Sequence, residues 1–229
     1  AINTLITVAD VDNATLSTAT VSITGGFVSG QDVLAFTSVP ATMGNIAGSY
    51  NAATGEMSLS SADNTATLAQ WQAALRAVTY SNSSEDPSTA ARTVSYTVND
   101  SAANSNTVTS TINLTAVDDP TVVVVDTITA TEDIAATGNV LTNDSDPDNT
   151  LTVATFTVSG VGTFNGGDTA TIPGVGTLQI NTDGSYTFTQ EPNYIGAVPV
   201  TTYTTNTGSS STLTISILTV NDAPVNTVP

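Results

Sequence analysis

The chain has 229 residues, a formal net charge of −18 at pH 7 and a hydrophobic content of 39%. The excess of acid excludes nucleic acid and anionic membrane surfaces as partners, because both need basic patches, and it favours cations. The absence of Cys and His excludes disulfides, thiolate or imidazole metal sites, and catalysis by Ser-His-Asp or Cys-His groups. No apolar run approaches the ~20 residues of a membrane helix, so we expect no membrane insertion.

One segment in the first half has helical periodicity. TATLAQWQAALRAV, residues 65–78, places Leu68, Trp71, Leu75 and Val78 three and four positions apart. This spacing predicts a short helix with Thr65 or Thr67 as its N-cap. We expect the only Trp to face the core and close one end of a sandwich; the alternative is that it stacks against a sugar.

The other regular stretches alternate β-branched or aromatic residues with small polar ones. In chain order they are TVSYTV at 93–98, VTSTINL at 108–114, SYTFT at 185–189 and LTISIL at 213–218. Alternation with period two predicts short antiparallel strands with one buried face, and strands at this spacing predict β-sandwiches. Asp183-Gly184, which lies between two alternating runs, predicts a hairpin turn.

The chain also repeats itself. ADVDNATL at 9–16 matches SDPDNTL at 145–151, and TAVDDP at 115–120 matches TVNDAP at 219–224. Each member of the second pair follows a strand that itself follows a tyrosine strand, with Tyr96 in one repeat and Tyr203 in the other. The sequence therefore predicts two tandem all-β domains, 1–117 and 118–229, joined near Asp118 to Pro120, where Pro120 stiffens the linker.

The first repeat lacks an opening strand. Its Asp-x-Asp motif begins at residue 10, whereas the second repeat has a long stretch between the join and its own motif at residue 146. Truncation at the N-terminus, or completion of the domain by preceding sequence, would account for the difference.

Acidic residues concentrate around the join. Eight of the 20 lie between 118 and 148: Asp118, Asp119, Asp126, Glu132, Asp133, Asp144, Asp146 and Asp148. Ca²⁺, which takes six to eight oxygen ligands in irregular geometry, would neutralise such a cluster. An Asp-x-Asp on an extended segment points both carboxylates to one side. The alternative is that these are solvated turn residues, since Asp and Asn are common in turns for local reasons.

Two more specific interpretations fail. DSDPDNT, residues 144–150, begins like an EF-hand loop, but Asn149 and Thr155 stand where that loop needs Gly and Glu. Paired carboxylates could serve as acid and base in a glycosidase. However, aromatics make up only 5% of the chain, which is thin for a sugar cleft, and we expect no enzyme activity.

The ordered motifs resemble a known family. Asp-x-Asp-Asn at the start of a β-unit, Tyr-Thr-Val-Asn-Asp at 96–100, and Ala-Val-Asp-Asp-Pro at the join resemble the cadherin-like repeats of large bacterial RTX-type adhesins. GTLQINTDGSYTFTQEPNYIG at 176–196 is similar to their VCBS-type extender repeats. The resemblance implies two tandem cadherin-like or immunoglobulin-like β-sandwiches, the first with a short helix. It implies a secreted bacterial cell-surface protein, acting in adhesion and biofilm, whose partners are neighbouring repeats stiffened by Ca²⁺.

The resemblance also implies the metal ligands. At the central junction they would be Asp100, Asp118, Asp119, Asp146 and Asp148. Asp144 is a further candidate on the residues alone, because it alternates with Asp146 and Asp148 in the same run. Asp10 and Asp12 would face a preceding domain, and Glu132, Asn221 and Asp222 a following one. The second repeat departs from the pattern, because Thr207 takes the place of Asp100.

Two rival functions remain open from the residues. A ligand-gripping module would hold a surface glycan or a protein, with Tyr50, Trp71 or Tyr194 exposed beside a calcium ion. Ice binding by Thr-rich strands is weaker, because ice faces need a regular Thr-x-Thr array and TTYTT at 201–205 stands alone in the sequence. High Thr content on strands is ordinarily a matter of β-propensity.

Overall fold

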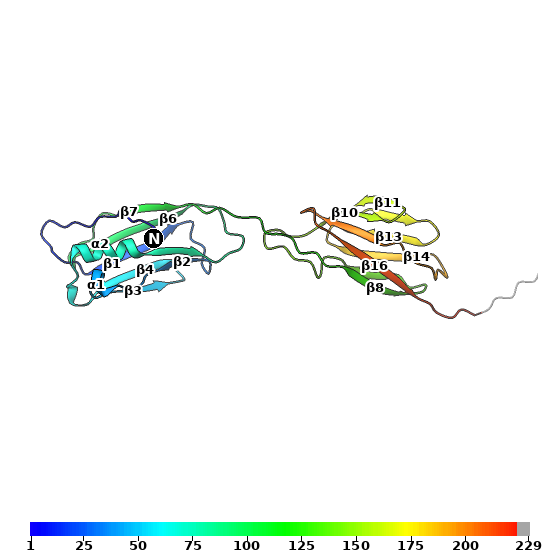
Figure 1. The fold of residues 1–229 in the computed structure, drawn as a ribbon, viewed down its shortest axis with the longest axis horizontal. Helices are drawn as coiled ribbons and strands as arrows, with labels where there is room; N and C mark the ends of the chain where they lie inside the picture. Colours follow the sequence, from blue (N-terminus) through cyan, green and yellow to red (C-terminus); the bar gives the residue numbers. More distant parts are fainter. Residues whose placement is uncertain (224–229) are drawn as a thin grey trace, which may run out of the picture. The chain divides into compact units, whose positions relative to one another are not determined.

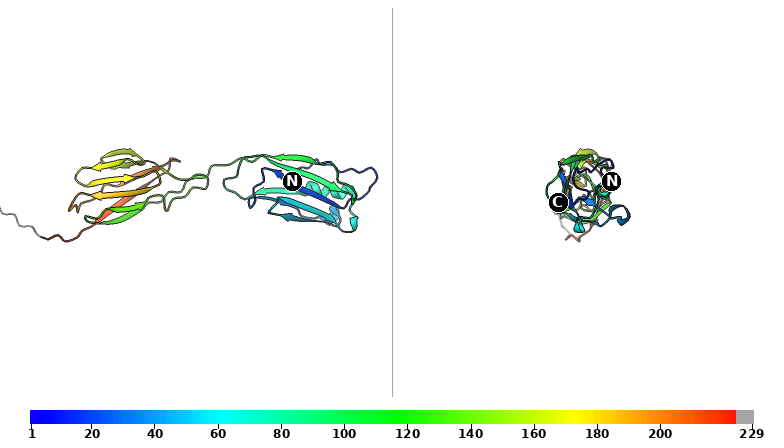
Figure 2. Two further views of the ribbon diagram at one scale, coloured as in Figure 1. Left: turned by 180° about the vertical axis from the view of Figure 1, so that it is seen from behind. Right: turned by 90° about the vertical axis from the view of Figure 1, so that its left-hand side faces the viewer.

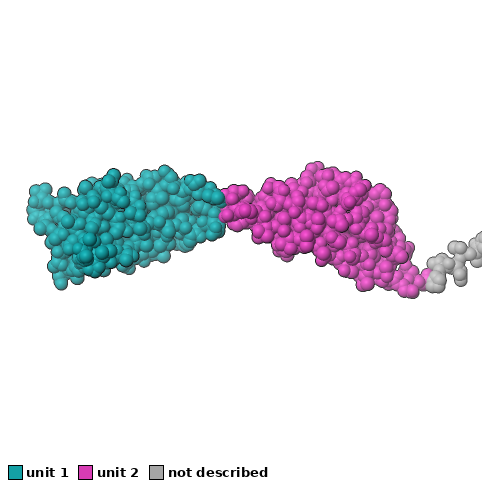
Figure 3. Space-filling model, in the orientation of Figure 1, with its two compact units in different colours: residues 1–117 teal, residues 118–229 magenta. Residues whose placement is uncertain are grey.

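The computed structural model describes residues 1–223, which form two compact units, Ala1–Val117 and a second that begins at Asp118 (Figure 1, Figure 3). Both units are built mainly of β-strands, so the all-β sandwich expectation is confirmed. Within these residues no helix has the length and apolar character needed to cross a bilayer.

Unit 1 is organised around one antiparallel five-stranded sheet in the order β3-β4-β1-β6-β7. The strands are β1 Thr18–Gly25, β3 Ile46–Asn51, β4 Glu56–Ser61, β6 Arg92–Asn99 and β7 Val108–Ile112. The alternation of residue types along β1 determines which side chains face the core. Ala19, Val21 and Ile23 are buried, while the residues between them are half-buried. The expected strand at 93–98 lies within β6, and the one at 108–114 becomes β7.

The opposite layer of unit 1 is mostly not a sheet. It contains the two-stranded pair β2 Asp32–Ala35 and β5 Thr79–Asn82, the short helix α1 Pro40–Met43, a 3-10 turn at Ala62–Asn64, and helix α2 Leu68–Ala77 (Figure 1, Figure 2). The expected helix is confirmed as α2. Thr67 is its N-cap and forms a capping box with Gln70, each side chain bonding the other's backbone N–H. α1, β2 and β5 were not anticipated, because their segments are too short to show a period.

Unit 2 is a sandwich of two sheets. The first has the order β11-β10-β15-β16-β8 and the second β12-β13-β14-β9. The strands are β8 Asp126–Thr131, β9 Ala136–Asn139, β10 Val153–Val158, β11 Gly162–Asn165, β12 Thr169–Ile172, β13 Gly176–Ile180, β14 Ser185–Gln190, β15 Thr201–Thr205 and β16 Ser210–Leu218. β8 pairs with β16 in parallel, while every other pairing in this unit is antiparallel.

The core of unit 2 lies between these two sheets. Phe156, Phe188 and Tyr203 are fully buried there. The predicted hairpin at Asp183-Gly184 is confirmed as the β13–β14 turn, where Gly184 has a φ of +83° that favours glycine. Long loops connect the sheets at the sandwich ends, and the acidic motifs lie in these loops.

Candidate metal centre

The Asp-x-Asp-Asn motifs of the two units fold into the same local turn. Asp146 Oδ1 accepts from the backbone N–H groups of Asp148 (2.9 Å) and Asn149 (2.7 Å). In unit 1, Asp10 Oδ1 accepts in the same way from Asp12 (3.1 Å) and Asn13 (2.9 Å). A carboxylate that bonds the backbone two and three residues ahead is the local turn that Asp favours. The hydrogen bonds from Asn13 and Asp12 lower the pKa of Asp10, which keeps it ionised.

In unit 2 the start of the domain folds back onto this turn. Asp119 donates its backbone N–H to Asp148 Oδ2, and Thr121 donates its hydroxyl to Asp146 Oδ2. Asn149 Nδ2 lies 3.4 Å from Asp118 Oδ1. The structure therefore brings together four predicted ligands, two from the linker and two from the Asp-x-Asp motif, all belonging to unit 2.

This acidic group has no basic partner. From Asp118 onward the sequence contains 12 acidic residues and no Lys or Arg. Asp148 Oδ1 is buried and has no hydrogen-bond partner among the residues described. A buried carboxylate oxygen without a partner carries a desolvation cost, which a cation would remove. The hydrogen bond from Thr121, together with those from Asp148 and Asn149, lowers the pKa of Asp146, so a proton does not neutralise it.

The side chains of this group are of the kind that binds Ca²⁺, but they are not arranged around a common point. All the converging groups offer oxygen, which is the donor that Ca²⁺ takes. Within residues 1–223, however, no three carboxylates already converge closely enough to hold an ion. Several of their oxygens are engaged by backbone N–H groups instead. Binding would therefore require the side chains of Asp118 and Asp119 to turn toward Asp146 and Asp148.

Asp100 lies away from the linker, contrary to the ligand set that the resemblance implied. Its Oδ2 accepts from Asn13 Nδ2 at 2.9 Å, and its Oδ1 accepts from two backbone N–H groups of its own turn. Asp100 follows β6, whereas residues 113–117 follow β7 at the other end of the same hairpin, so the length of β6, about 25 Å, separates them. Asp100 therefore groups with Asp10, beside a cavity of about 240 Å³ that both residues line.

Unit 2 repeats this grouping with a neutral residue. Thr207, in the turn after β15, has its hydroxyl oxygen 2.7 Å from that of Thr121, and Thr121 donates its own proton to Asp146. The position next to the Asp-x-Asp turn is thus Asp100 in one unit and Thr207 in the other. The alignment of the two repeats had already shown that Thr207 replaces Asp100. It had placed Asp100 at the linker, however, which is at the other end of unit 1.

Asp144 points away from Asp146 and Asp148, into the body of unit 2. Its Oδ1 accepts from the backbone N–H of Val124 (2.8 Å), and its Oδ2 accepts from the hydroxyl of Tyr203 (2.8 Å). Nearby Asp126 has a buried Oδ2 with no partner in the described structure. Burial raises the pKa of Asp126, and the charge of Asp144 raises it further. Asp144 therefore has a structural role here, which its position in the acidic run had not suggested.

Replacing Asp126 by Asn is expected to stabilise unit 2 by about 1 kcal/mol at pH 7, because it removes the negative charge of a half-buried carboxylate that lies near the charge of Asp144. The pKa of Asp126 is raised in the folded state, so its ionisation costs stability above the folded pKa and costs nothing below the ordinary value of 3.8. The gain should therefore vanish near pH 3. Calorimetry at both pH values measures it, and Glu191→Gln, which removes an equal charge from the same unit, is the control. If Glu191→Gln stabilised unit 2 equally, the gain would come from the lower net charge of the unit and not from the surroundings of Asp126.

Glu132 and Asp222 lie at the other end of unit 2. Glu132 follows the last residue of β8 and is 5% exposed, and its Oε2 accepts from the backbone N–H of Val220 at 2.7 Å. Asn221 and Asp222 come next in the chain and are exposed. Pro224, which ends the repeated motif at 219–224, lies outside the described residues. Glu132 thus bonds the backbone two residues before Asp222, in a unit without a basic residue, and its role as a metal ligand together with Asp222 stays a prediction.

The most buried charged group was missed in the sequence. Asp32 and Arg92 form an ion pair with Nε–Oδ2 at 3.1 Å, and both side chains are completely buried in unit 1. Tyr80 and Asn82 donate to Asp32 Oδ1. Burial alone would raise the pKa of Asp32, but the hydrogen bonds from Tyr80, Asn82 and others outweigh it and lower the pKa. One signal was available: Arg92 occupies an inward position in the alternation of its strand.

The aromatic residues proposed to grip a ligand are engaged elsewhere. Trp71 is fully buried and donates its indole N–H to Leu16 O (3.1 Å), so the core expectation is confirmed and the sugar-stacking alternative is wrong. Tyr50 and Tyr194 are half-buried, and their hydroxyls donate to Asp32 O (2.8 Å) and Ala197 O (2.6 Å).

The Thr-rich strand at 201–205 does not stand alone in space. On the outward face of the first sheet of unit 2, Thr202 pairs with Thr157 on one side and Thr212 on the other. Thr157 in turn bonds Thr163 at 2.8 Å. TTYTT, which stands alone in the sequence, therefore belongs to a row of threonines across neighbouring strands. Sheets twist from strand to strand, so such a row does not form the flat lattice that an ice face needs.

These features define a class of protein: a tandem β-sandwich whose paired aspartates gather at sandwich ends. Residues 118–219, nearly the whole of unit 2, match the family model of the bacterial cadherin-like domain. Domains of this kind are typically adhesive or extending modules without enzyme activity. No curated protein matches the chain.

Proposed function

We propose that this chain is a Ca²⁺-stiffened extender segment of a large secreted bacterial adhesin of the RTX type, which projects a binding domain from the cell surface. The observation that carries the proposal is the group formed by Asp118, Asp119, Asp146 and Asp148, with a buried unpartnered oxygen on Asp148 and no basic residue in the unit. The cadherin-like match to residues 118–219 supports it.

The proposed mechanism is mechanical. Without calcium, the carboxylates of residues 118, 119, 146 and 148 repel one another, and the chain on either side of the stiff Pro120 has no fixed direction where it enters unit 2. Calcium held between the linker and the Asp-x-Asp turn would fix the direction in which the chain enters unit 2. The turns at Asp10 with Asp100, and at Glu132 with Asp222, would serve further junctions of the same kind. Extracellular modules bind Ca²⁺ with Kd of ~10⁻⁴–10⁻³ M, which suits an extracellular setting.

Calcium is expected to raise the melting temperature of unit 2. An ion that binds only the folded state adds about 2.7 kcal/mol at a hundredfold excess over Kd. Calorimetry in EGTA and in millimolar Ca²⁺ measures the shift for the wild type and for the Asp146→Asn, Asp148→Asn double variant, which should lose it. The matched control is Asp168→Asn with Glu191→Gln, which removes the same charge from loops outside the group. A calcium shift absent from the wild type would make these aspartates solvated turn residues.

Stiffening needs a separate readout. The chain has no Cys, so spin labels can be attached specifically at Ser60→Cys in unit 1 and Thr187→Cys in unit 2, both exposed positions. The distribution of distances between the labels should narrow in Ca²⁺ for the wild type and stay broad for the double variant. Binding without narrowing would contradict the extender role and favour a ligand-gripping module.

A further inference from the structure

The two five-stranded sheets differ at one edge. β1, β6 and β7 of unit 1 correspond to β10, β15 and β16 of unit 2, because each set follows the Asp-x-Asp turn in the same order and pairs in the same way. In unit 2 the outer edge of β16 is covered by β8, in parallel register from Leu213 with Asp126 to Leu218 with Thr131. In the described part of unit 1, β7 pairs with β6 alone.

The hydrogen bonds of a buried tyrosine also differ between the two units. Tyr203 OH lies 2.8 Å from Asp144 Oδ2 and 3.2 Å from Val124 O, which belongs to the segment that leads into β8. Its counterpart Tyr96 is 2% exposed, and its hydroxyl has no hydrogen-bond partner within residues 1–223. Val8 stands two residues before Asp10, as Asp144 stands two before Asp146, and its side chain offers no acceptor. The two groups that accept from Tyr203 therefore have no counterpart in unit 1. The hydroxyl of Ser110, which accepts from Asn3, approaches Tyr96 without forming a hydrogen bond of ordinary geometry with it.

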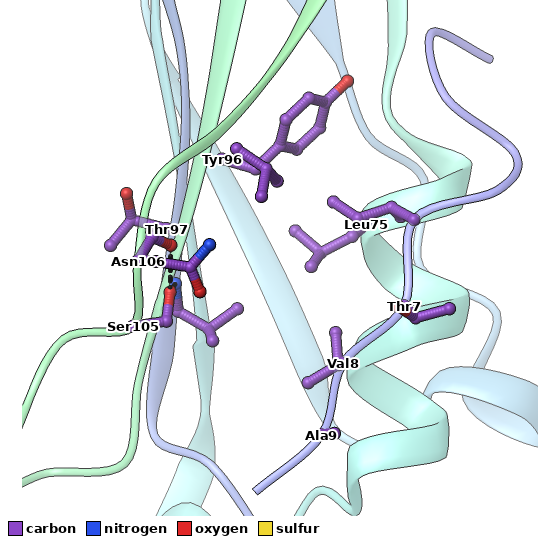
Figure 4. A pocket seen from close by; sticks show the side chains of 11 residues that line it. Thr7, Val8, Ala9, Leu75, Tyr96, Thr97, Ser105 and Asn106 are labelled. Atoms are coloured by element: carbon purple, nitrogen blue, oxygen red, sulfur yellow. Dashed lines mark hydrogen bonds between the residues drawn. The ribbon is translucent and has the colours of Figure 1, made fainter.

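A cavity lies at this place in unit 1. Its volume is about 290 Å³, and its walls include Val8, Ala9, Leu75, Tyr96 and Val108 (Figure 4). Figure 4 shows residues 7–9 on one side and the β6–β7 residues on the other, with Leu75 of α2 projecting between them.

In unit 2 the corresponding place is filled by backbone. Val122 exchanges two hydrogen bonds of 2.9 Å with Ser145, and Val124 N donates to Asp144. Counted from the Asp-x-Asp turns, Ser145 and Asp144 correspond to Ala9 and Val8, which both line the cavity of unit 1. The cavity therefore matches the path of the Val122–Val125 segment.

The edge of β7 is also unprotected. Its sequence, VTSTI, contains neither charge nor proline, which are the devices that keep an edge strand from pairing with another strand. Val108 is 41% exposed beside the cavity. An open edge, a neighbouring cavity lined by both apolar and polar side chains, and an unpartnered buried hydroxyl are together what an additional strand would need in order to bind here.

We propose that unit 1 is a strand acceptor, in which the edge of β7 binds an extended segment of the Thr121–Thr131 type, running parallel to β7 and joined ahead of Ala1. A backbone carbonyl of the segment accepts from Tyr96 OH, and the backbone of the segment occupies the cavity, as the backbone of Val122–Val125 does in unit 2. Strand addition of this kind takes affinity from main-chain hydrogen bonds and specificity from side-chain pockets. The polypeptide direction follows from unit 2, because residues 1–9 correspond to 137–145, which follow β8 there.

The experiment adds the proposed strand to unit 1 by fusion. Residues Thr121–Ala136, fused directly ahead of Ala1, place a second copy of the β8 segment in the register that unit 2 uses. Trp71, the only Trp, lies in unit 1 and reports its unfolding by fluorescence. We expect the melting temperature of unit 1 to rise by about 5 °C or more, and amide exchange along β7 to slow about tenfold. The matched control is the same extension carrying Thr127→Pro and Thr129→Pro, which cannot pair and should do neither.

The Tyr96→Phe variant tests for the specific hydrogen bond, because an extension that merely stabilised unit 1 would not change the effect of this substitution. In the present chain the substitution should leave the melting temperature of unit 1 unchanged or higher, because the lost hydroxyl has no partner. In the extended chain it should lower that temperature, because the hydroxyl now has an acceptor. Tyr203→Phe, which loses existing partners, should lower the stability of unit 2 in both chains.

Three outcomes would overturn the proposal. The first is unchanged exchange along β7 in the extended chain. The second is an equal effect of Tyr96→Phe with and without the extension. The third is a dimer in light scattering of the extended chain, which would mean that the strand passes between copies and is not taken up within one chain.

Discussion

Replacing Arg92 by Met is expected to destabilise unit 1 by about 3–5 kcal/mol, because it leaves the buried carboxylate of Asp32 without its cation. Arg92 also donates two hydrogen bonds of 2.6 Å from Nη1 to Ser88 O and Ala90 O, so the loop before β6 loses its attachment. A loss of this size is comparable with the whole stability of a small domain. Chemical denaturation followed by Trp71 fluorescence measures it.

Arg76→Met is the matched control for this prediction. Arg76 is the only other basic residue; its side chain is half-buried, and its Nε donates a hydrogen bond of 2.9 Å to Ile6 O. Its replacement should cost about 1 kcal/mol. The Asp32→Leu, Arg92→Met double variant should be less destabilised than the sum of the two single variants, because no charge is then left buried alone. An additive result would show that the two residues do not act as a pair.

Trp71→Ala is expected to cost unit 1 about 3–5 kcal/mol, the range for removing a fully buried aromatic side chain. The indole joins α2 to the chain entering β1 through its bond to Leu16 O, so the substitution removes both volume and a hydrogen bond. Circular dichroism measures the loss, since the variant has no Trp fluorescence. Trp71→Phe keeps most of the volume and should cost clearly less.

The same variant separates a core residue from a ligand-binding one. If Trp71 stacked against a sugar, Trp71→Ala would leave the melting temperature nearly unchanged and abolish binding to glycans. Its complete burial leads us to expect the opposite result. Unchanged stability would contradict the packing described here.

Local physics explains which features of this chain could be predicted. The period-two alternation of strands such as β6 and β14, the helical spacing of Leu68, Trp71 and Leu75, and the Asp183-Gly184 turn all depend on neighbours within a few residues. The Asp-x-Asp-Asn turn is equally local, because Asp146 bonds backbone only two and three residues ahead. For this reason the repeated motif takes the same conformation in both units.

Contacts between distant residues were beyond such reasoning. Asp100 joins Asp10 because β6 and β7 form a hairpin whose turn lies at that end of the sheet, and no pattern in the sequence marks the end. Asp144 and Tyr203 are 59 positions apart, and Asp32 and Arg92 are 60 apart. Their pairing follows from sheet order, which depends on how hydrophobic faces are buried together.

Local sequence patterns are enough to define a tandem all-β chain with a short helix, carrying acidic turns that lack basic partners. Periodicity, turn chemistry and charge depend only on residue types and on neighbours within a few positions, so they can be interpreted without knowledge of the fold. The folded arrangement was needed to show which carboxylates meet, which ion pair is buried, and that Tyr96 lacks the partners that Tyr203 has. These depend on strand pairing across long separations, where packing of the whole unit overrides any local preference.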